Sequence, residues 1–196
     1  MNLTDKIEAY RVILASGSPR RHELLAGLDF PFEIDTLSNV DESYDPAMAS
    51  DQVPVFLARQ KSVGFHRELK DNEILITADT IVVINGEILG KPKDYNDAFS
   101  MLRTLSGNTH TVFTGVCIRS RQKESSFTAS TRVTFKELSD EEITYYLNNY
   151  KPYDKAGSYG VQEWIGYIAI TSIDGSYYNV MGLPIQRLYT ELNKFL

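Results

Sequence analysis

A basic turn near the start of the chain carries the first residue types that could do chemistry. Residues 15–21 read ASGSPRR, so a turn with two serines leads into the adjacent Arg20 and Arg21. A helix start presents unpaired backbone N–H groups and the positive end of the helix dipole. Guanidinium groups add paired donors that match phosphate oxygens, and the hydroxyls of Ser16 and Ser18 add further donors. Two interpretations stay open: a phosphate-binding turn, or a capped surface helix with exposed arginines.

A carboxylate interrupts an apolar stretch further along the chain. Residues 74–83 read ILITADTIVV, and Asp79 stands in the middle of this β-rich sequence. A carboxylate is costly there unless it is paired, bound to a metal or placed at the open end of a strand. Asp79 is therefore a candidate general base or metal ligand at the edge of a sheet. The alternative is an aspartate that caps a turn.

Two loops supply further polar candidates. The sequence GKPK at 90–93 holds Lys91 between a glycine and a proline, which stiffen the backbone. The sequence DKAGSYGVQ at 154–162 contains Lys155 and Gln162, and the amide of Gln162 can pair with the edge of a base. Taken singly, the first stretch favours a solvated turn and the second a flexible loop.

Several familiar sites are missing from the sequence. It contains no P-loop, no dinucleotide fingerprint and no nucleophile elbow. His22, His66 and His110 lack the spacing of metal ligands. The single cysteine, Cys117, lies in an apolar run, which favours a buried core residue over a catalytic thiol.

Composition narrows the class of protein. The chain has 196 residues, 42% hydrophobic and 23% charged, which predicts a single domain over residues 1–196, or two small lobes that share a core. A net charge of -6 argues against nucleic acid as a partner. No apolar run reaches the roughly 20 residues that span a bilayer. The N-terminal sequence MNLTDKIEAYR has acids and no hydrophobic segment, so we expect a cytoplasmic protein without a secretory signal or a membrane partner.

Helical and strand patterns are mixed along the chain. Together with a hairpin turn at Asn85-Gly86, they predict an α/β or α+β fold built on one large sheet. Long polar stretches at 37–50 and 151–163 are interpreted as loops. The expected strands lie at 11–15, 32–36, 74–78, 80–89, 109–119, 127–137, 166–172 and 177–180, and the expected helices at 19–28, 53–69, 96–105, 140–150 and from 184 onward.

Seven stretches match one family, in order, through nearly the whole chain. They are ILASGSPRRHELL at 13–25, VDE at 40–42, ARQKS at 58–62, ADTIVVINGEILGKP at 78–92, MLRTLSGNTHTVFTGV at 101–116, DKAGSYGVQ at 154–162 and GSYYNVMGLP at 175–184. On these stretches the sequence resembles the Maf family of nucleoside triphosphate pyrophosphatases. The resemblance implies a mixed twisted sheet with flanking helices, in an elongated two-lobed Maf/ITPase-like α/β fold with a deep central cleft. It also implies a homodimer.

The resemblance implies a reaction as well. Family members hydrolyse a nucleoside triphosphate to the monophosphate and diphosphate with a divalent metal cation, Mg²⁺ or Mn²⁺, whose ligands the resemblance leaves open. Carried across by motif, Asp79 is the proton acceptor. The residues implied at the phosphates are Ser16, Arg21, Lys61 and Lys91, with Lys155 and Glu42 as weaker candidates for the same cleft.

Three positions separate the subgroups of the family. The subgroup that resembles 7-methyl-GTP pyrophosphatases carries tryptophan, glutamine and glutamate where this chain has Arg20, Thr80 and Gln162. This chain is similar instead to the dTTP/UTP subgroup, and an amide and a hydroxyl can both donate and accept, as a thymine or uracil edge requires. A modified pyrimidine nucleotide would suit the same residues. The alternatives are a nucleotide-binding regulator of septum formation without turnover and a 7-methyl-GTP pyrophosphatase.

Overall fold

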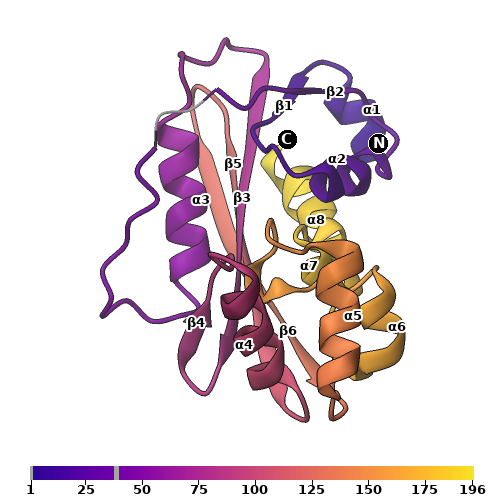
Figure 1. Cartoon of the computed structure of the whole chain (residues 1–196). Coiled ribbons are helices and arrows are strands. Elements are labelled where there is room, and N and C mark those ends of the chain that lie inside the picture. Colours follow the sequence, from indigo (N-terminus) through magenta and orange to yellow (C-terminus); the bar gives the residue numbers. More distant parts are fainter. Residues whose placement is uncertain (1, 38–39) are drawn as a thin grey trace. The chain divides into compact units, whose positions relative to one another are not determined.

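The computed structural model describes residues 2–37 and 40–196 (Figure 1). Residues 38 and 39 of the predicted loop at 37–50 therefore lie outside the described residues. Helices and strands alternate along the chain. The helices are α1 Leu3–Ile7, α2 Pro19–Ala26, α3 Val53–Val63, α4 Tyr95–Leu105, α5 Asp140–Tyr150, the 3₁₀ turn η1 Ala156–Ser158, α6 Trp164–Ala169, α7 Tyr177–Met181 and α8 Ile185–Phe195. The strands are β1 Arg11–Leu14, β2 Phe32–Ile34, β3 Glu73–Ile84, β4 Glu87–Leu89, β5 Thr109–Arg119, β6 Glu124–Phe135 and β7 Ile170–Asp174.

The strands of the described chain form one mixed sheet. Six of its seven strands follow the order β2-β1-β3-β5-β6-β7, and the seventh, β4, pairs with β3 off this path. β1 runs parallel to β2 and to β3, whereas β4 is antiparallel to β3 and β7 is antiparallel to β6. The predicted α/β class, a mixed sheet with flanking helices, is confirmed.

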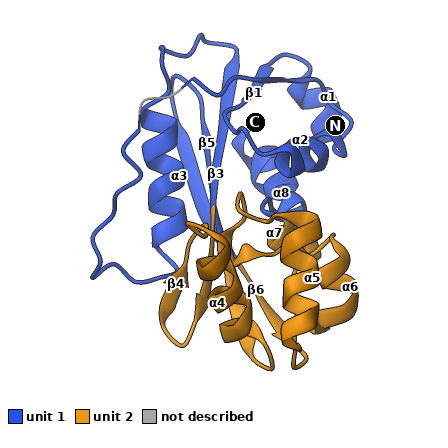
Figure 2. Ribbon diagram, viewed as in Figure 1, with its two compact units in different colours: residues 1–79, 114–129, 182–196 blue, residues 80–113, 130–181 orange. Residues whose placement is uncertain are grey.

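The chain divides into two compact units (Figure 2). Unit 1 contains residues 1–79, 114–129 and 182–196, and unit 2 contains residues 80–113 and 130–181. Strands β3, β5 and β6 contribute residues to both units. The single domain over residues 1–196 and the central cleft stay predictions.

In unit 1, β1 ends beside β3, which continues along the sheet to Ile84. The register places Leu14 of β1 beside Ile76 of β3, and both side chains are fully buried. The pairing continues one residue further, because the Ala15 N–H donates to the Ile76 carbonyl at 2.9 Å. The turn before α2 therefore begins beside β3 at the carboxyl end of β1, a position where parallel sheets commonly hold ligands. The prediction that Asp79 lies at the open end of a strand is wrong, because β3 runs without a break from Glu73 to Ile84.

Helix α3 lies along the unit 1 part of β3 and β5 (Figure 1). A Cβ atom at Gly115 of β5 would lie 2.1 Å from the Val55 nitrogen and 2.2 Å from the Pro54 carbonyl carbon. Only glycine at this position allows the start of the helix to approach the strand so closely. One turn further on, the Thr77 hydroxyl of β3 donates to the Ala58 carbonyl at 2.6 Å. These contacts fix the register of α3 against β3.

The structure corrects several predicted elements. The predicted strand at 166–172 is helix α6 up to residue 169, and the predicted strand at 177–180 is helix α7. Short apolar runs fit both periodicities, so sequence pattern alone does not separate them. The helix predicted to reach residue 69 ends at Val63, because Gly64 closes it as the C-cap. The predicted hairpin turn is confirmed, with φ values of 52° at Asn85 and 81° at Gly86.

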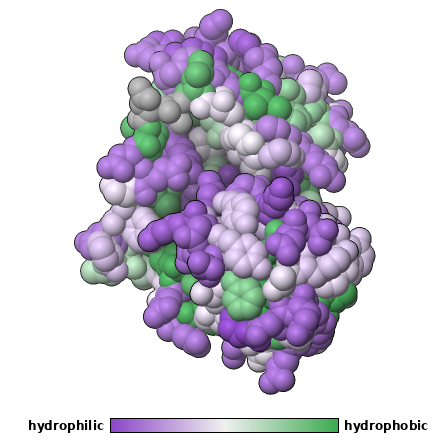
Figure 3. Space-filling view, viewed as in Figure 1, coloured by the Kyte–Doolittle hydropathy of each residue, from purple (hydrophilic) through white to green (hydrophobic). Residues whose placement is uncertain are grey.

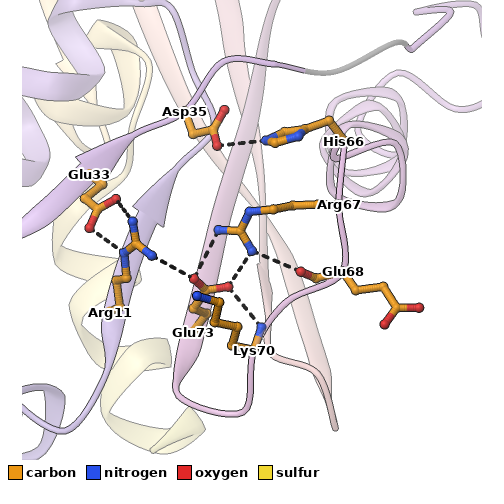
Figure 4. Close-up of polar contacts among 8 residues, drawn as sticks. All are labelled: Arg11, Glu33, Asp35, His66, Arg67, Glu68, Lys70 and Glu73. Carbon is orange, nitrogen blue, oxygen red and sulfur yellow. Dashed lines mark hydrogen bonds and ion pairs between the residues drawn. The ribbon is translucent and has the colours of Figure 1, made fainter.

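A network of ion pairs holds the amino ends of β1 and β3 (Figure 4). The Glu73 side chain is 0% exposed, and it accepts hydrogen bonds from Arg67 at 2.7 Å and from Arg11 at 3.2 Å. The Lys70 backbone N–H donates to the same carboxylate at 2.9 Å. The hydrogen bond from Arg67 is the largest of the causes that lower the pKa of Glu73 from 4.5 to about 2. Arg11 also pairs with Glu33 of β2, so this network joins three strands.

We expect Glu73→Gln to lower the free energy of unfolding at neutral pH by about 2–3 kcal/mol. The folded-state pKa lies below the ordinary value of 4.5, so the carboxylate stabilises the fold above that pH. This stability is lost as the pH falls from about 4.5 to about 2. Urea unfolding at neutral pH and at about pH 3 measures both effects. A variant with the same pH dependence as the natural chain would contradict the assignment.

The surface carries scattered apolar residues. On the face drawn in Figure 3, hydrophobic residues stand in small groups among hydrophilic ones. Val63 is 73% exposed and Tyr167 is 84% exposed. Single exposed apolar side chains are common on folded proteins. Within the described residues, the helices do not combine the length and the apolar character that crossing a bilayer requires.

Candidate functional site

Arg21, in the first turn of α2, connects the basic turn to the middle of β3. Its Nε donates to the Gly182 carbonyl at 2.7 Å, and its Nη1 donates to the Ala78 carbonyl at 2.9 Å. Nη1 also lies 3.3 Å from the Ser16 hydroxyl. Burial lowers the pKa of Arg21, while the nearby charge of Asp79 raises it. The guanidinium is therefore a fixed cation next to the candidate base.

Ser16 shapes the turn before α2. Its buried Oγ accepts a hydrogen bond from the Ser18 backbone N–H at 3.3 Å. The His22 Nε2 atom lies 2.5 Å from the Ser16 carbonyl and fixes the other side of the residue. Ser18 stands at the N-cap of α2, and its side chain makes no capping hydrogen bond within the described residues. This helix start thus combines backbone donors with Ser16 and Arg21, as the anion-binding interpretation requires.

Lys61 of α3 reaches two carboxylates. Its Nζ lies 2.6 Å from Asp79 Oδ1 and 3.2 Å from Glu42 Oε1. Lys61 follows Ala58 by three residues, so both lie on one face of the helix, and Asp79 follows Thr77 by two residues on one face of β3. The Thr77–Ala58 hydrogen bond therefore sets the register that brings the lysine to the aspartate. Both side chains of the Lys61–Asp79 pair are mostly buried, which strengthens their attraction.

These contacts gather one group of predicted residues in unit 1. The group runs from Ser16 through Arg21 to Asp79, Lys61 and Glu42. Glu42 was the weaker sequence candidate, yet it shares the lysine with the predicted base. Arg20 stands beside Arg21 on α2, and its charge lowers the pKa of Arg21. A fixed guanidinium, an ammonium and two carboxylates can bind an anion and accept a proton.

Unit 2 holds the remaining predicted residues. The Gly157 N–H donates to the Gly90 carbonyl at 3.0 Å, so the loop of Lys91 is tied to the loop that begins at Lys155. Gly157 has a φ of 68°, and a Cβ there would lie 3.0 Å from a methyl carbon of Val82. The turn therefore requires glycine at position 157. Lys91 is exposed, and Thr80 is half-buried in β3.

Gln162 occupies the third position of a turn that spans residues 160–163. The Glu163 N–H closes the turn by donating to the Gly160 carbonyl at 3.0 Å. Oε1 of Gln162 is buried and has no hydrogen-bond partner among the described residues. Such amide oxygens are rare in folded proteins and mark candidate ligand contacts. Lys155 forms ion pairs with two carboxylates: its Nζ lies 2.8 Å from Oδ1 of Asp154 and 3.0 Å from Oε1 of Glu163.

Comparison with known protein families shows which family the chain belongs to. The family model described as Maf-like protein matches residues 11–195. The chain belongs to the Maf family. The matched residues include the ASGSPRR turn, Asp79 and Gln162.

Curated relatives match this Maf-like chain along almost its full length. The dTTP/UTP pyrophosphatase of Porphyromonas gingivalis is 53% identical over 195 residues, which cover 98% of each chain. The protein of the same name from Phocaeicola vulgatus is 52% identical over 192 residues, covering 98% of this chain and 100% of the relative. That from Flavobacterium johnsoniae is 50% identical over 190 residues, covering 97% of each. A solved HAM1 protein from Coxiella burnetii, 12% identical, has a TM-score of 0.49 over 94% of this chain and 99% of its own, a likeness too low for any inference.

The cysteine and the three histidines of the Maf-like chain lie in different environments. Cys117 is fully buried, and burial raises its pKa to about 11, so the thiol stays protonated at neutral pH. The prediction of a core cysteine is confirmed. His22 contacts Ser16, His66 contacts Asp35 and His110 contacts Tyr159.

Sequence reasoning missed the backbone partners of Arg21. The carbonyls of Ala78 and Gly182 accept two of its hydrogen bonds, and a backbone carbonyl leaves no mark in residue types. The motif GSYYNVMGLP was matched to the family without a role for Gly182.

Proposed function

We propose that the chain is a nucleoside triphosphate pyrophosphatase that hydrolyses dTTP and UTP to the monophosphate and diphosphate. Such an enzyme is a hydrolase acting on acid anhydrides. Relatives named dTTP/UTP pyrophosphatase are about half identical to the chain over almost its full length. The observation that carries the proposal is the Lys61–Asp79 pair, joined through Ala78 to the fixed cation of Arg21.

The unit 1 group supports hydrolysis at the α-phosphorus. A triphosphate carries about four negative charges, and Arg21, Lys61 and the first amides of α2 offer positive charge to its oxygens. Asp79 accepts from Lys61 through Oδ1, and we assign Oδ2 to the attacking water. The water oxygen forms a bond to the α-phosphorus, its proton passes to Asp79, and the bond to the bridging oxygen of the diphosphate breaks. We assign Lys91, which is exposed, to phosphate binding, as the family resemblance implies.

A divalent cation, Mg²⁺ or Mn²⁺, belongs to this proposal. Glu42 and Asp79 both contact the ammonium group of Lys61, and this convergence supports the assignment of both carboxylates to the metal ion. Hard oxygen ligands of this kind suit both ions, and phosphates with water commonly complete the coordination. The described residues contain no group of three His, Cys, Asp or Glu side chains arranged for a metal. When bound, the ion neutralises charge on the diphosphate leaving group.

Base selection is assigned to Gln162, Thr80 and Arg20. The amide of Gln162 can donate and accept, and its buried Oε1 has no partner within the described residues. The Thr80 hydroxyl has the same two capacities. A modified pyrimidine base presents similar groups, so the proposal covers pyrimidine triphosphates with this hydrogen-bonding edge.

We expect Gln162→Glu to lower the ratio of kcat/KM for UTP to that for GTP by roughly 10–100-fold, because a carboxylate cannot donate to a uracil carbonyl. Steady-state assays with both nucleotides measure the ratio. The same substitution at exposed Gln186, which bonds only to Thr190 on its own helix, is the matched control. An unchanged ratio in Gln162→Glu would remove this residue from base selection.

A nucleotide panel tests the proposed function. The protein is incubated with Mg²⁺ or Mn²⁺ and with dTTP, UTP, CTP, GTP, 7-methyl-GTP or ATP, and monophosphate and diphosphate are measured separately. We expect fastest release from dTTP and UTP. Binding of dTTP without release of any product would instead indicate a nucleotide-binding regulator. Fastest release from 7-methyl-GTP would indicate the other subgroup.

The homodimer, the cytoplasmic location and the lack of nucleic-acid or membrane partners stay predictions. Size-exclusion chromatography with light scattering measures the oligomeric state directly. The expected result is a mass twice that of the 22.2 kDa chain.

A further inference from the structure

One hydroxyl group in unit 2 holds both ends of the turn that carries Gln162. The Tyr146 hydroxyl donates to Oε2 of Glu163, the last residue of the turn. The same oxygen accepts from the Gly160 N–H, at the first residue of the turn, at 3.1 Å. Tyr146 lies on α5 and is 0% exposed, so water does not compete for these contacts. The phenol thus acts as a brace across the turn.

Glu163 adds a second constraint to the turn. Its Oε1 lies 3.0 Å from the Nζ of Lys155, while Oε2 receives the tyrosine hydroxyl. A Cβ at Gly160 would lie 2.8 Å from Cδ of Glu163, so glycine leaves the space into which the carboxylate folds. Each carboxylate oxygen of Glu163 therefore has a partner. These contacts fix the side chain of Glu163, the residue that follows Gln162.

The protonation state of Tyr146 fits this role. Burial, and then the hydrogen bond to Glu163, raise the pKa of Tyr146 above its usual value. The phenol therefore keeps its proton at ordinary pH and remains a donor to Glu163. Nearby, the Tyr159 hydroxyl lies 2.7 Å from Nε2 of buried His110, which anchors the chain just before the turn.

We propose that Tyr146 is a positioning residue for base selection, which braces the turn so that Gln162 presents its amide in one orientation. The inference rests on the proposed function, because it assigns Gln162 to the base. Without the brace, the turn can rotate and the amide loses its fixed donor and acceptor directions. A preorganised hydrogen-bonding group discriminates between bases more strongly than a mobile one.

The test is Tyr146→Phe, which removes the hydroxyl and keeps the buried ring. UTP and CTP differ at the base edge, where a carbonyl replaces an amino group. We expect the ratio of kcat/KM for UTP to that for CTP to fall about tenfold. Loss of folded protein lowers both values equally, so the ratio reports positioning rather than stability. Tyr150→Phe is the matched control, since Tyr150 stacks on Tyr146 at 5.2 Å from the same helix but is partly exposed.

A second variant keeps the inference testable if Tyr146→Phe does not fold. Glu163→Gln keeps an acceptor for the hydroxyl but removes the charge that strengthens both of its contacts, so we expect a smaller fall in the same ratio. The inference would be overturned if every variant of Tyr146→Phe and Glu163→Gln that folds has a UTP/CTP ratio of kcat/KM within about twofold of the natural ratio.

Equilibrium binding of UTP and CTP separates this inference from the proposed function. If the natural chain binds both nucleotides but releases no diphosphate, the proposed function fails, and the ratio of the two dissociation constants still tests Tyr146. A fall of that ratio in Tyr146→Phe supports the brace, and an unchanged ratio overturns it. If neither nucleotide binds, both proposals fail.

Discussion

Asp79→Asn is expected to lower kcat for dTTP and UTP by about 10²–10⁴-fold, the usual effect of removing a general base. The asparagine amide keeps the shape of the side chain and an oxygen that can accept from Lys61. In the natural chain, Nζ of Lys61 lies 2.6 Å from Oδ1 of Asp79. The amide cannot take a proton from water, so the loss falls on kcat more than on KM. Diphosphate release under saturating nucleotide measures the effect.

The control for this variant is the same substitution at an exposed carboxylate. Asp71 pairs with Arg121 at 3.1 Å on the surface of unit 1, so Asp71→Asn should leave kcat unchanged. Circular dichroism of both variants checks the fold. Full activity in a folded Asp79→Asn protein would remove Asp79 from the role of proton acceptor.

Arg21→Lys is expected to lower kcat/KM by about 10²-fold, the second large effect. The guanidinium reaches the carbonyls of Gly182 and Ala78 and the hydroxyl of Ser16 at once. A lysine ammonium has neither the planar fork nor the reach to keep all three contacts. A buried carbonyl that loses its donor costs about 1–3 kcal/mol, so the melting temperature should fall as well.

Arg187→Lys serves as the control for this charge-conserving change. Arg187 is exposed and pairs with Glu191 one turn along α8, so both activity and melting temperature should stay unchanged. Steady-state kinetics and thermal unfolding are measured on the two variants in parallel. If kcat/KM of Arg21→Lys equals that of the natural chain, a simple positive charge suffices at this position.

The sequence predicted the unit 1 group best where a polar residue interrupts an apolar pattern. Asp79 stands inside such a run, and the ASGSPRR turn joins a strand to a helix, so both stood out without any structure. Lys61 gave no comparable signal, because it lies on the polar part of an ordinary helical pattern. Its role came from the family resemblance, and the contact with Asp79 came from the register of α3 against β3.

Tertiary contacts explain what the sequence did not predict. The segments at 166–172 and 177–180 are too short for periodicity to distinguish a strand from a helix. The approach of α3 to Gly115 depends on residues far apart in the chain. The brace by Tyr146 has the same origin, because the helical pattern of α5 marks this residue only as part of the core.

Hydrolysis of UTP in ¹⁸O-labelled water tests the central claim most directly. Mass spectrometry locates the label after a single turnover of the natural chain and of Asp79→Asn. Attack at the α-phosphorus predicts label in UMP, unlabelled diphosphate, and loss of both products in the variant. Label in the diphosphate, or release of UDP and phosphate, would contradict the account.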